Sequence, residues 1–145
     1  MQKLQGQLQT KGSLPTISSY LKLLSDAFLL TSLDKYYSSA YKSGKSSPKL
    51  VIHDNALLRS LERPLRADIN SERFGRYFEN TVLSRFVEAG WEVFYWAERK
   101  MEVDMIALGH NGEKWAVETK SSRITKSDLK GLFHFCSRHK SFVPC

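Results

Sequence analysis

Apolar residues in the first half of this chain follow a helical period and then a strand period. Between positions 15 and 28 they recur every three or four residues with polar residues between them, which predicts one amphipathic helix. Residues 29–37 and 49–53 are short apolar runs of strand type, and a loop rich in Ser, Gly and Lys separates them. The basic segment 59–70 lacks such a pattern and predicts a linker.

The second half predicts a long helix followed by strands. The helix covers 71–89 and ends at Gly90, and its apolar row consists of Phe74, Phe78, Val82 and Phe86. We expect three strands at 91–97, 102–108 and 114–120, a helix from Thr125 to about His139, and a further strand starting at 142. This order indicates an α/β (α+β) domain with a mixed sheet flanked by helices. The last strand has little room to pair, so we expect a fragment of a longer protein.

The composition fits a soluble globular protein. Apolar residues make up 41% of the chain, which is enough for one ordinary domain or a domain with a small companion. The sequence contains neither an apolar run of the roughly 18 residues that span a bilayer nor a signal peptide. Its two cysteines, Cys136 and Cys145, are too few for a disulfide framework. We therefore expect a cytoplasmic protein without membrane contact.

The charge is distributed unevenly. The chain carries 22 basic and 15 acidic side chains, a net charge of +7. Residues 1–70 hold ten of the basic and five of the acidic ones, whereas residues 71–145 hold twelve and ten. An excess of cations suits a polyanion, so we expect any nonspecific affinity for DNA to lie in the first half. The acidic residues of the second half are the type that a cation site uses.

Charged residues of the predicted sheet and long helix carry the candidate chemistry. Side chains alternate along a strand, so Glu118 and Lys120 share one face of the third strand of the second half. By the same rule Asp104 shares a face of the second strand with Ile106. Glu79 lies beside the apolar row of the long helix and could add a further carboxylate.

The turn between these two strands decides whether the carboxylates meet. A two-residue turn at 111–112 would set Asp104 opposite Thr119, on the wrong face. A three-residue loop at 110–112, with its glycine in the left-handed conformation, would set Asp104 directly across from Glu118. The sequence allows both hairpins, and the second one makes a site.

Two carboxylates at that separation repel each other unless a cation lies between them, and oxygen ligands of this kind select Mg²⁺ or Mn²⁺. Such an ion polarises a phosphodiester and activates an attacking water, while Lys120 could stabilise the developing negative charge. The alternative is that Asp104 and Glu118 are ordinary surface residues of a half-exposed hairpin. A Glu-x-Lys triplet is weak evidence alone, because a second one occurs in the polar connector 98–100.

Two other motifs are weaker. Gly44-Lys45-Ser46 is part of a phosphate-binding loop motif, but it lacks the earlier glycine, and Pro48 follows too soon for the required helix. No ATP site is therefore expected in this chain. His134, Cys136 and His139 lack the paired spacing of zinc ligands.

Most of the chain resembles one family. The stretches that carry the resemblance are GRYFEN (75–80), GWEVFYW (90–96), EVD (102–104) and AVETK (116–120). They resemble the C-terminal domain of unknown function that follows the ATPase module in bacterial and archaeal AAA-type ATP-binding proteins. Those domains are similar to PD-(D/E)xK nucleases, which have a restriction-endonuclease-like fold. Residues 16–58 resemble the family's segment between a winged-helix-like region and the nuclease-like fold.

The resemblance implies roles for individual residues. Asp104 and Glu118 would be metal ligands, Lys120 the catalytic lysine and Glu79 the helix carboxylate. Thr119 stands where the family more often has an apolar residue. The implied organisation is a tail from an upstream module at 1–13, a winged-helix-like linking segment at 14–58, a basic linker at 59–70 and a nuclease-like domain at 71–145.

Three functions follow as hypotheses. The first is the C-terminal part of an AAA-type ATPase with a Mg²⁺-dependent, phosphodiesterase-type site that acts on or binds DNA. The second is a nuclease-fold module without catalysis that binds DNA or a protein. The third is a winged-helix-type binding protein whose carboxylates are incidental.

Overall fold

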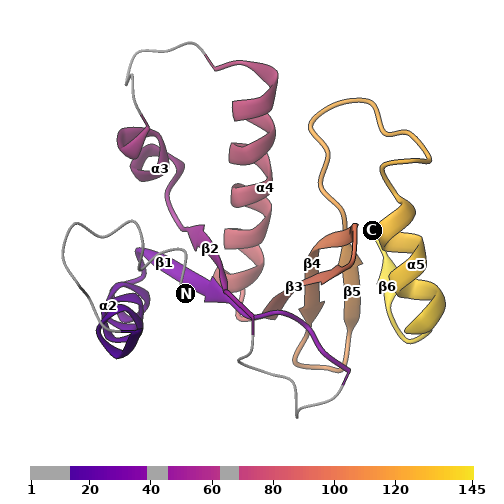
Figure 1. Ribbon diagram of the computed structural model, residues 1–145, viewed down its shortest axis with the longest axis horizontal. Coiled ribbons are helices and arrows are strands. Elements are labelled where there is room, and N and C mark those ends of the chain that lie inside the picture. The colour runs from indigo at the N-terminus through magenta and orange to yellow at the C-terminus, as the bar shows by residue number, and fades with distance from the viewer. Residues whose placement is uncertain (1–13, 39–45, 63–68) are drawn as a thin grey trace.

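The computed structural model describes residues 14–38, 46–62 and 69–145, which form a mixed α/β structure (Figure 1). The helices of these ranges are α2 (Leu14–Asp26), α3 (Asn55–Leu61), α4 (Ser71–Glu88) and α5 (Lys130–Arg138). The strands are β1 (Leu30–Leu33), β2 (Lys49–Ile52), β3 (Glu92–Glu98), β4 (Met101–Leu108), β5 (Lys114–Val117) and β6 (Val143–Pro144).

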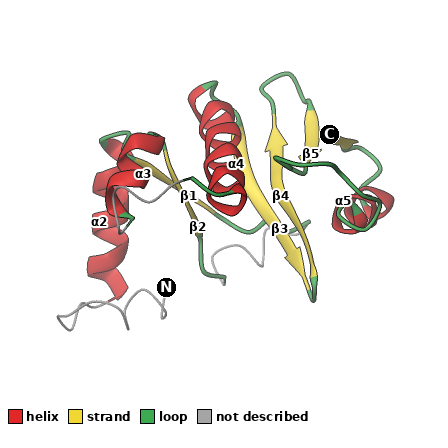
Figure 2. Ribbon diagram, turned by 90° about the horizontal axis from the view of Figure 1, so that it is seen from above, coloured by secondary structure: helices red, strands yellow, loops and turns green. Residues whose placement is uncertain are grey.

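A four-stranded mixed sheet with the order β3-β4-β5-β6 is the centre of the second half. The first three strands are antiparallel neighbours, and β6 pairs in parallel with β5. Helix α4 packs against β3 and β4 on one face, whereas α5 lies on the other face (Figure 2). The predicted mixed sheet flanked by helices is confirmed. The last predicted strand, β6, pairs with β5 over only two residue pairs, in line with the little room that was expected for it.

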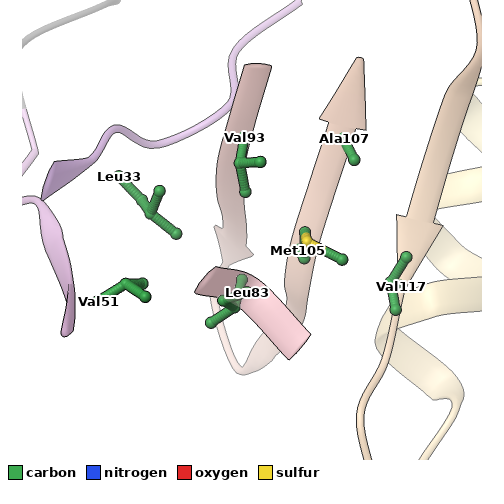
Figure 3. Close-up of a cluster of buried hydrophobic side chains, with 7 residues drawn as sticks. All are labelled: Leu33, Val51, Leu83, Val93, Met105, Ala107 and Val117. Atoms are coloured by element: carbon green, nitrogen blue, oxygen red, sulfur yellow. The ribbon is translucent and has the colours of Figure 1, made fainter. Parts of the chain in front are cut away.

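Two buried clusters, one on each face of the sheet, form the core. The cluster beneath α4 consists of Leu33, Val51, Leu83, Val93, Met105, Ala107 and Val117 (Figure 3). The cluster beneath α5 consists of Trp96, Val103, Ile106, Ala116, Leu132, Phe135 and Phe142. The first cluster includes one residue from β1 and one from β2, so the N-terminal hairpin completes the core around α4.

The N-terminal hairpin is also fastened to α4 by hydrogen bonds. Strands β1 and β2 pair antiparallel, which confirms the predicted two-stranded element. The amide of Asn80 on α4 then bonds both backbone groups of Ile52. The Ile52 N–H donates to Asn80 Oδ1 at 3.0 Å, and Asn80 Nδ2 donates to the Ile52 carbonyl at 2.6 Å. A side-chain amide thus takes the place of a neighbouring strand at this edge of β2.

The buried face of α4 differs from the predicted apolar row. Tyr77 and Leu83 are buried, whereas Phe74 and Phe78 are 52% and 40% exposed. The inward face carries polar residues with local partners, such as Ser84, whose hydroxyl donates to the Thr81 carbonyl. The predicted row is therefore half right, because Val82 and Phe86 pack against the core while Phe74 and Phe78 do not, and polar residues on the inward face break the apolar pattern.

Two helix boundaries also depart from the predictions. Helix α3 covers Asn55–Leu61, where the basic linker was expected to begin, and Asp54 caps it by accepting a hydrogen bond from the Ala56 N–H at 2.7 Å. Helix α5 begins at Lys130 and not at Thr125. The Asp128 carboxylate accepts from the Thr125 N–H at 2.8 Å and so closes a separate turn ahead of the helix.

Several expectations fall on residues outside the described ranges. These are the tail at 1–13, most of the Gly-Lys-Ser loop and the middle of the basic linker. Six of the ten basic residues of the first half also lie there, namely Lys3, Lys11, Lys42, Lys45, Arg63 and Arg66. Among the residues that the structure does describe, no helix has the length and apolar character needed to cross a membrane.

Candidate functional site

The loop between β4 and β5 sets the candidate residues in register. The Gly109 N–H donates to the Glu113 carbonyl at 2.8 Å, and Gly112 has a φ of +87°, so three residues form the loop. The paired strands then place Met105 opposite Val117. One step further along this register, Asp104 falls across from Glu118. The three-residue alternative for this loop is confirmed.

A β-bulge determines where the Asp104 side chain lies. Phe94 pairs with Ile106 but Trp96 pairs with Val103, so Tyr95 alone faces two residues of β4, Asp104 and Met105. The extra residue puts both Val103 and Ile106 in the cluster beneath α5. Asp104 instead lines a cavity with residues of α4 and β2. The predicted common face of Asp104 and Ile106 is therefore not found.

The Asp104 carboxylate binds Thr119 in the segment that follows β5. Its Oδ2 accepts hydrogen bonds from the Thr119 N–H and the Thr119 hydroxyl, both at 2.9 Å. Strand β5 ends at Val117, so the alternation predicted as far as Lys120 stops before the candidate residues. The strand pattern had assigned Thr119 to the opposite face, but Thr119 contacts Asp104 directly in the site.

Glu118 is a buried carboxylate with one satisfied and one unsatisfied oxygen. Lys120 Nζ donates to Glu118 Oε1 at 2.6 Å, and the Glu118 side chain is only 6% exposed. Among the described residues Oε2 is buried without any hydrogen-bond partner. Burial is the main cause that raises the pKa of Glu118, and the charge of Asp104 adds to it. The hydrogen bond and charge of Lys120 and a weaker hydrogen bond from the Asp104 backbone oppose both.

The pKa of Lys120 is raised in turn. Its hydrogen bond to Glu118 is the largest cause, and the negative charges of Asp104 and Asp128 act in the same direction. Lys120 is therefore a protonated cation close to two carboxylates of the sheet. The backbone of Glu118 is fixed by β6, because the Cys145 N–H donates to the Ala116 carbonyl and the Glu118 N–H donates to the Cys145 carbonyl, both at 2.9 Å.

Glu79 lines the same cavity as Asp104. It lines a cavity of about 370 Å³ together with Asp104 and Glu102. Its carboxylate forms an ion pair with Lys49 of β2. The structure thus brings Asp104, Glu118 and Lys120 together and leaves Glu79 neutralised by a lysine.

The fit of a cation to this site is partial. The ranges described contain no group of three or more His, Cys, Asp or Glu side chains that could hold a metal ion. The carboxylates of Asp104 and Glu118, including the unpartnered Oε2 of Glu118, nevertheless supply hard oxygen ligands of the type that Mg²⁺ and Mn²⁺ prefer. Asp104 and Glu118 are the residues that would hold such an ion.

One comparison with known proteins bears on this part of the chain. Residues 74–145 match the family model of DUF4143, a domain of unknown function. The DUF4143 region begins within α4 and contains all four predicted site residues. Neither the curated proteins nor the solved structures include a match to the chain.

Sequence reasoning missed Lys49 as a member of the site. Lys49 lies 30 residues before Glu79, outside the DUF4143 region, and reaches the cavity from β2. A lysine in a short strand carries no local signal of such a role, because only the docking of the hairpin on α4 creates the contact.

Proposed function

We propose that Asp104, Glu118 and Lys120 form a divalent-cation-dependent, phosphodiesterase-type site that acts on DNA. The chain would serve as the C-terminal part of an AAA-type ATPase. The observation that carries this proposal is the buried, unpartnered Oε2 of Glu118 next to the charge of Asp104. A buried acceptor without a partner is costly, and a cation held between the two carboxylates would satisfy it.

Each residue would have a distinct part in the reaction. A bound Mg²⁺ or Mn²⁺ would supply Lewis-acid polarisation of the phosphodiester. Asp104 and Glu118 would hold the ion, and Thr119 would orient Asp104 through its two hydrogen bonds. Lys120, released from Glu118 Oε1 when the ion binds, would place its ammonium against the negative charge that develops on the phosphate.

A second candidate function is a nuclease-fold module without catalysis that binds DNA or a protein. One specific observation favours it: lysines already pair with two of the three carboxylates. Lys120 pairs with Glu118 and Lys49 pairs with Glu79, so the two lysines could neutralise these carboxylates in place of a metal ion. In that case the protein would be insensitive to divalent ions.

Replacement of Lys120 separates the two functions. In Lys120→Gln we expect Mn²⁺ binding to be retained or tightened, because lysine is not a ligand and its charge opposes that of the ion. Cleavage of plasmid DNA in Mn²⁺ should fall by about 100-fold or more. Calorimetric titration and a nicking assay give the two readouts, with Lys100→Gln in the other Glu-x-Lys triplet as the control. If wild-type protein bound no Mn²⁺, the first function would be excluded and only the second would remain.

The raised pKa of Glu118 predicts a pH dependence of stability. A carboxyl whose pKa in the folded state lies above its ordinary value of 4.5 stabilises the fold below that value. This contribution is lost as the pH rises through the folded-state pKa, because the buried group must then ionise. Wild type should therefore lose stability relative to Glu118→Gln as the pH rises above about 4.5 in metal-free buffer.

Urea unfolding of both proteins across this range measures the effect. Added Mn²⁺ should reverse the trend for wild type only, since a metal ligand must be deprotonated and the ion competes with the proton. A stability difference that stays constant with pH would show that Glu118 does not titrate in the folded protein as its burial predicts.

A further inference from the structure

A second, larger cavity adjoins the candidate site. It has a volume of about 600 Å³ and is lined by the segment that follows β1, by β3 and by the C-terminal end of α5. Trp96 and Ala97 of β3 line both this cavity and the one that contains Asp104. The two cavities therefore share this part of the edge strand β3, one on the side of α5 and the other on the side of α4, and the larger one has the volume of a small-ligand site.

The segment that follows β1 is held against the sheet and α5, which gives this cavity a fixed wall. Lys35 forms a parallel bridge with Tyr95, and the Tyr36 N–H donates to the Tyr95 carbonyl at 2.7 Å. The Tyr36 ring packs edge-on against Phe135 and Phe142, with centroid distances of 5.7 and 5.5 Å. Lys35 and Tyr37, on either side of Tyr36, line the cavity from this wall.

The lining of the larger cavity combines cations with an aromatic ring. Lys35 Nζ lies 5.3 Å from the centre of the Tyr37 ring. Arg138 of α5 pairs with Glu98 at 2.7 Å, but both side chains are about half exposed, at 55% and 42%. An exposed ion pair contributes little stability, so the Arg138 guanidinium can exchange Glu98 for another anion at small cost.

His139 adds an uncharged surface to this lining. Its ring packs on Phe135 with centroids 4.4 Å apart, and burial with the neighbouring Arg138 charge lowers its pKa. Among the described residues, the charged groups that line the cavity are Lys35, Arg138 and Glu98, a net positive set. A positive cavity with an aromatic ring suits a phosphate joined to a planar base, because guanidinium and ammonium groups bind the phosphate and the ring can stack on the base.

We propose that this cavity binds one nucleotide of an unpaired DNA strand, with the phosphate held by Lys35 and Arg138 and the base beside Tyr37. The strand would pass over the edge of the sheet at Trp96 and Ala97 toward Asp104, and a neighbouring phosphodiester would then lie at the candidate site. This proposal rests on the proposed phosphodiesterase function and gives its substrate class. A cavity of about 600 Å³ accommodates a single nucleotide but not a duplex.

Binding of a short oligonucleotide tests the proposal. The probe is fluorescein-labelled pentathymidylate, measured by anisotropy at low salt in EDTA, so that no divalent ion takes part. Lys35→Gln and Arg138→Gln should each weaken binding about tenfold, the effect of losing one charge-assisted hydrogen bond.

The chain offers a matched control for Arg138. Arg85 of α4 pairs with Glu88 at the same distance of 2.7 Å and is 73% exposed, and it lines neither of the two cavities. Arg85→Gln removes the same charge from a comparable pair and should leave pentathymidylate binding unchanged. As an independent readout, pentathymidylate with a central 5-iodouracil should crosslink to Tyr37 under ultraviolet light.

Two results would overturn the nucleotide site. One is an equal loss of affinity in Arg138→Gln and Arg85→Gln, which would mean nonspecific attraction. The other is a blunt duplex that binds as tightly as pentathymidylate. Failure of the proposed function has a different signature: wild-type protein would bind no Mn²⁺, yet would bind the oligonucleotide with the expected dependence on Lys35 and Arg138.

Discussion

Asp104→Asn is expected to abolish divalent-cation binding while the protein stays folded. The asparagine keeps an oxygen that can accept the hydrogen bonds of Thr119 but loses the charge that a metal ion needs. The Mn²⁺ affinity measured by calorimetry should fall by about 100-fold or more, and the thermal midpoint in EDTA should stay close to that of wild type. Glu98→Gln, in the other Glu-x-Lys triplet, is the control and should bind Mn²⁺ normally.

Asp104→Ala distinguishes the two roles of this carboxylate. From sequence alone its thermal midpoint is expected to be unchanged or higher, because one of two repelling carboxylates is removed. The structure reverses that expectation, since alanine cannot accept the hydrogen bonds from Thr119 and the fold should lose about 1–3 kcal/mol. If Asp104→Asn bound Mn²⁺ like wild type, Asp104 would be a structural residue only.

Gly131→Ala is expected to destabilise the protein strongly, although alanine is the better helix former. A Cβ at Gly131 would lie 2.0 Å from the Glu102 carbonyl oxygen, which is backbone of β4 and cannot turn aside. Helix propensity favours alanine by about 1 kcal/mol, whereas forcing α5 away from the sheet costs about 1–3 kcal/mol or more. The steric term should win, with a lower urea midpoint as the result.

Gly75→Ala is the matched control for this substitution. Gly75 is also helical, but a Cβ there would meet only the Ser121 hydroxyl, at 3.2 Å, and that side chain can rotate. Its stability should be unchanged or up to about 1 kcal/mol higher. If Gly131→Ala unfolded at the same urea concentration as wild type, the close approach of α5 to β4 would be contradicted.

The elements of the second half are predictable because their signals are local. Asn70 caps α4 by accepting from the Arg73 N–H at 2.9 Å, and Gly90 has the positive φ of +81° that ends the helix. The hairpin loop is partly predictable. Its glycine allows a left-handed residue in either of two loops, and only the pairing of β4 with β5 selects the three-residue form.

The geometry of the site depends on contacts that leave no local pattern. The bulge at Asp104 and Met105 arises from the pairing of β4 with β3. The alternation of apolar and polar residues in the sequence does not reveal it. The Lys49–Glu79 ion pair joins residues 30 positions apart. The sequence therefore predicts which carboxylates are candidates, but not which of them the fold brings together.

The N-terminal hairpin docks on α4, so residue 74, where the DUF4143 match begins, is not where the folded structure begins. Residue 74 lies within the first turns of α4, after its Asn70 cap. Leu33 and Val51 share a buried cluster with Leu83, and Asn80 bonds the backbone of Ile52. A unit that began at residue 74 would lose the helix cap and one wall of its core together. We therefore expect the hairpin and the sheet to unfold together, although the DUF4143 match covers only the sheet and most of α4.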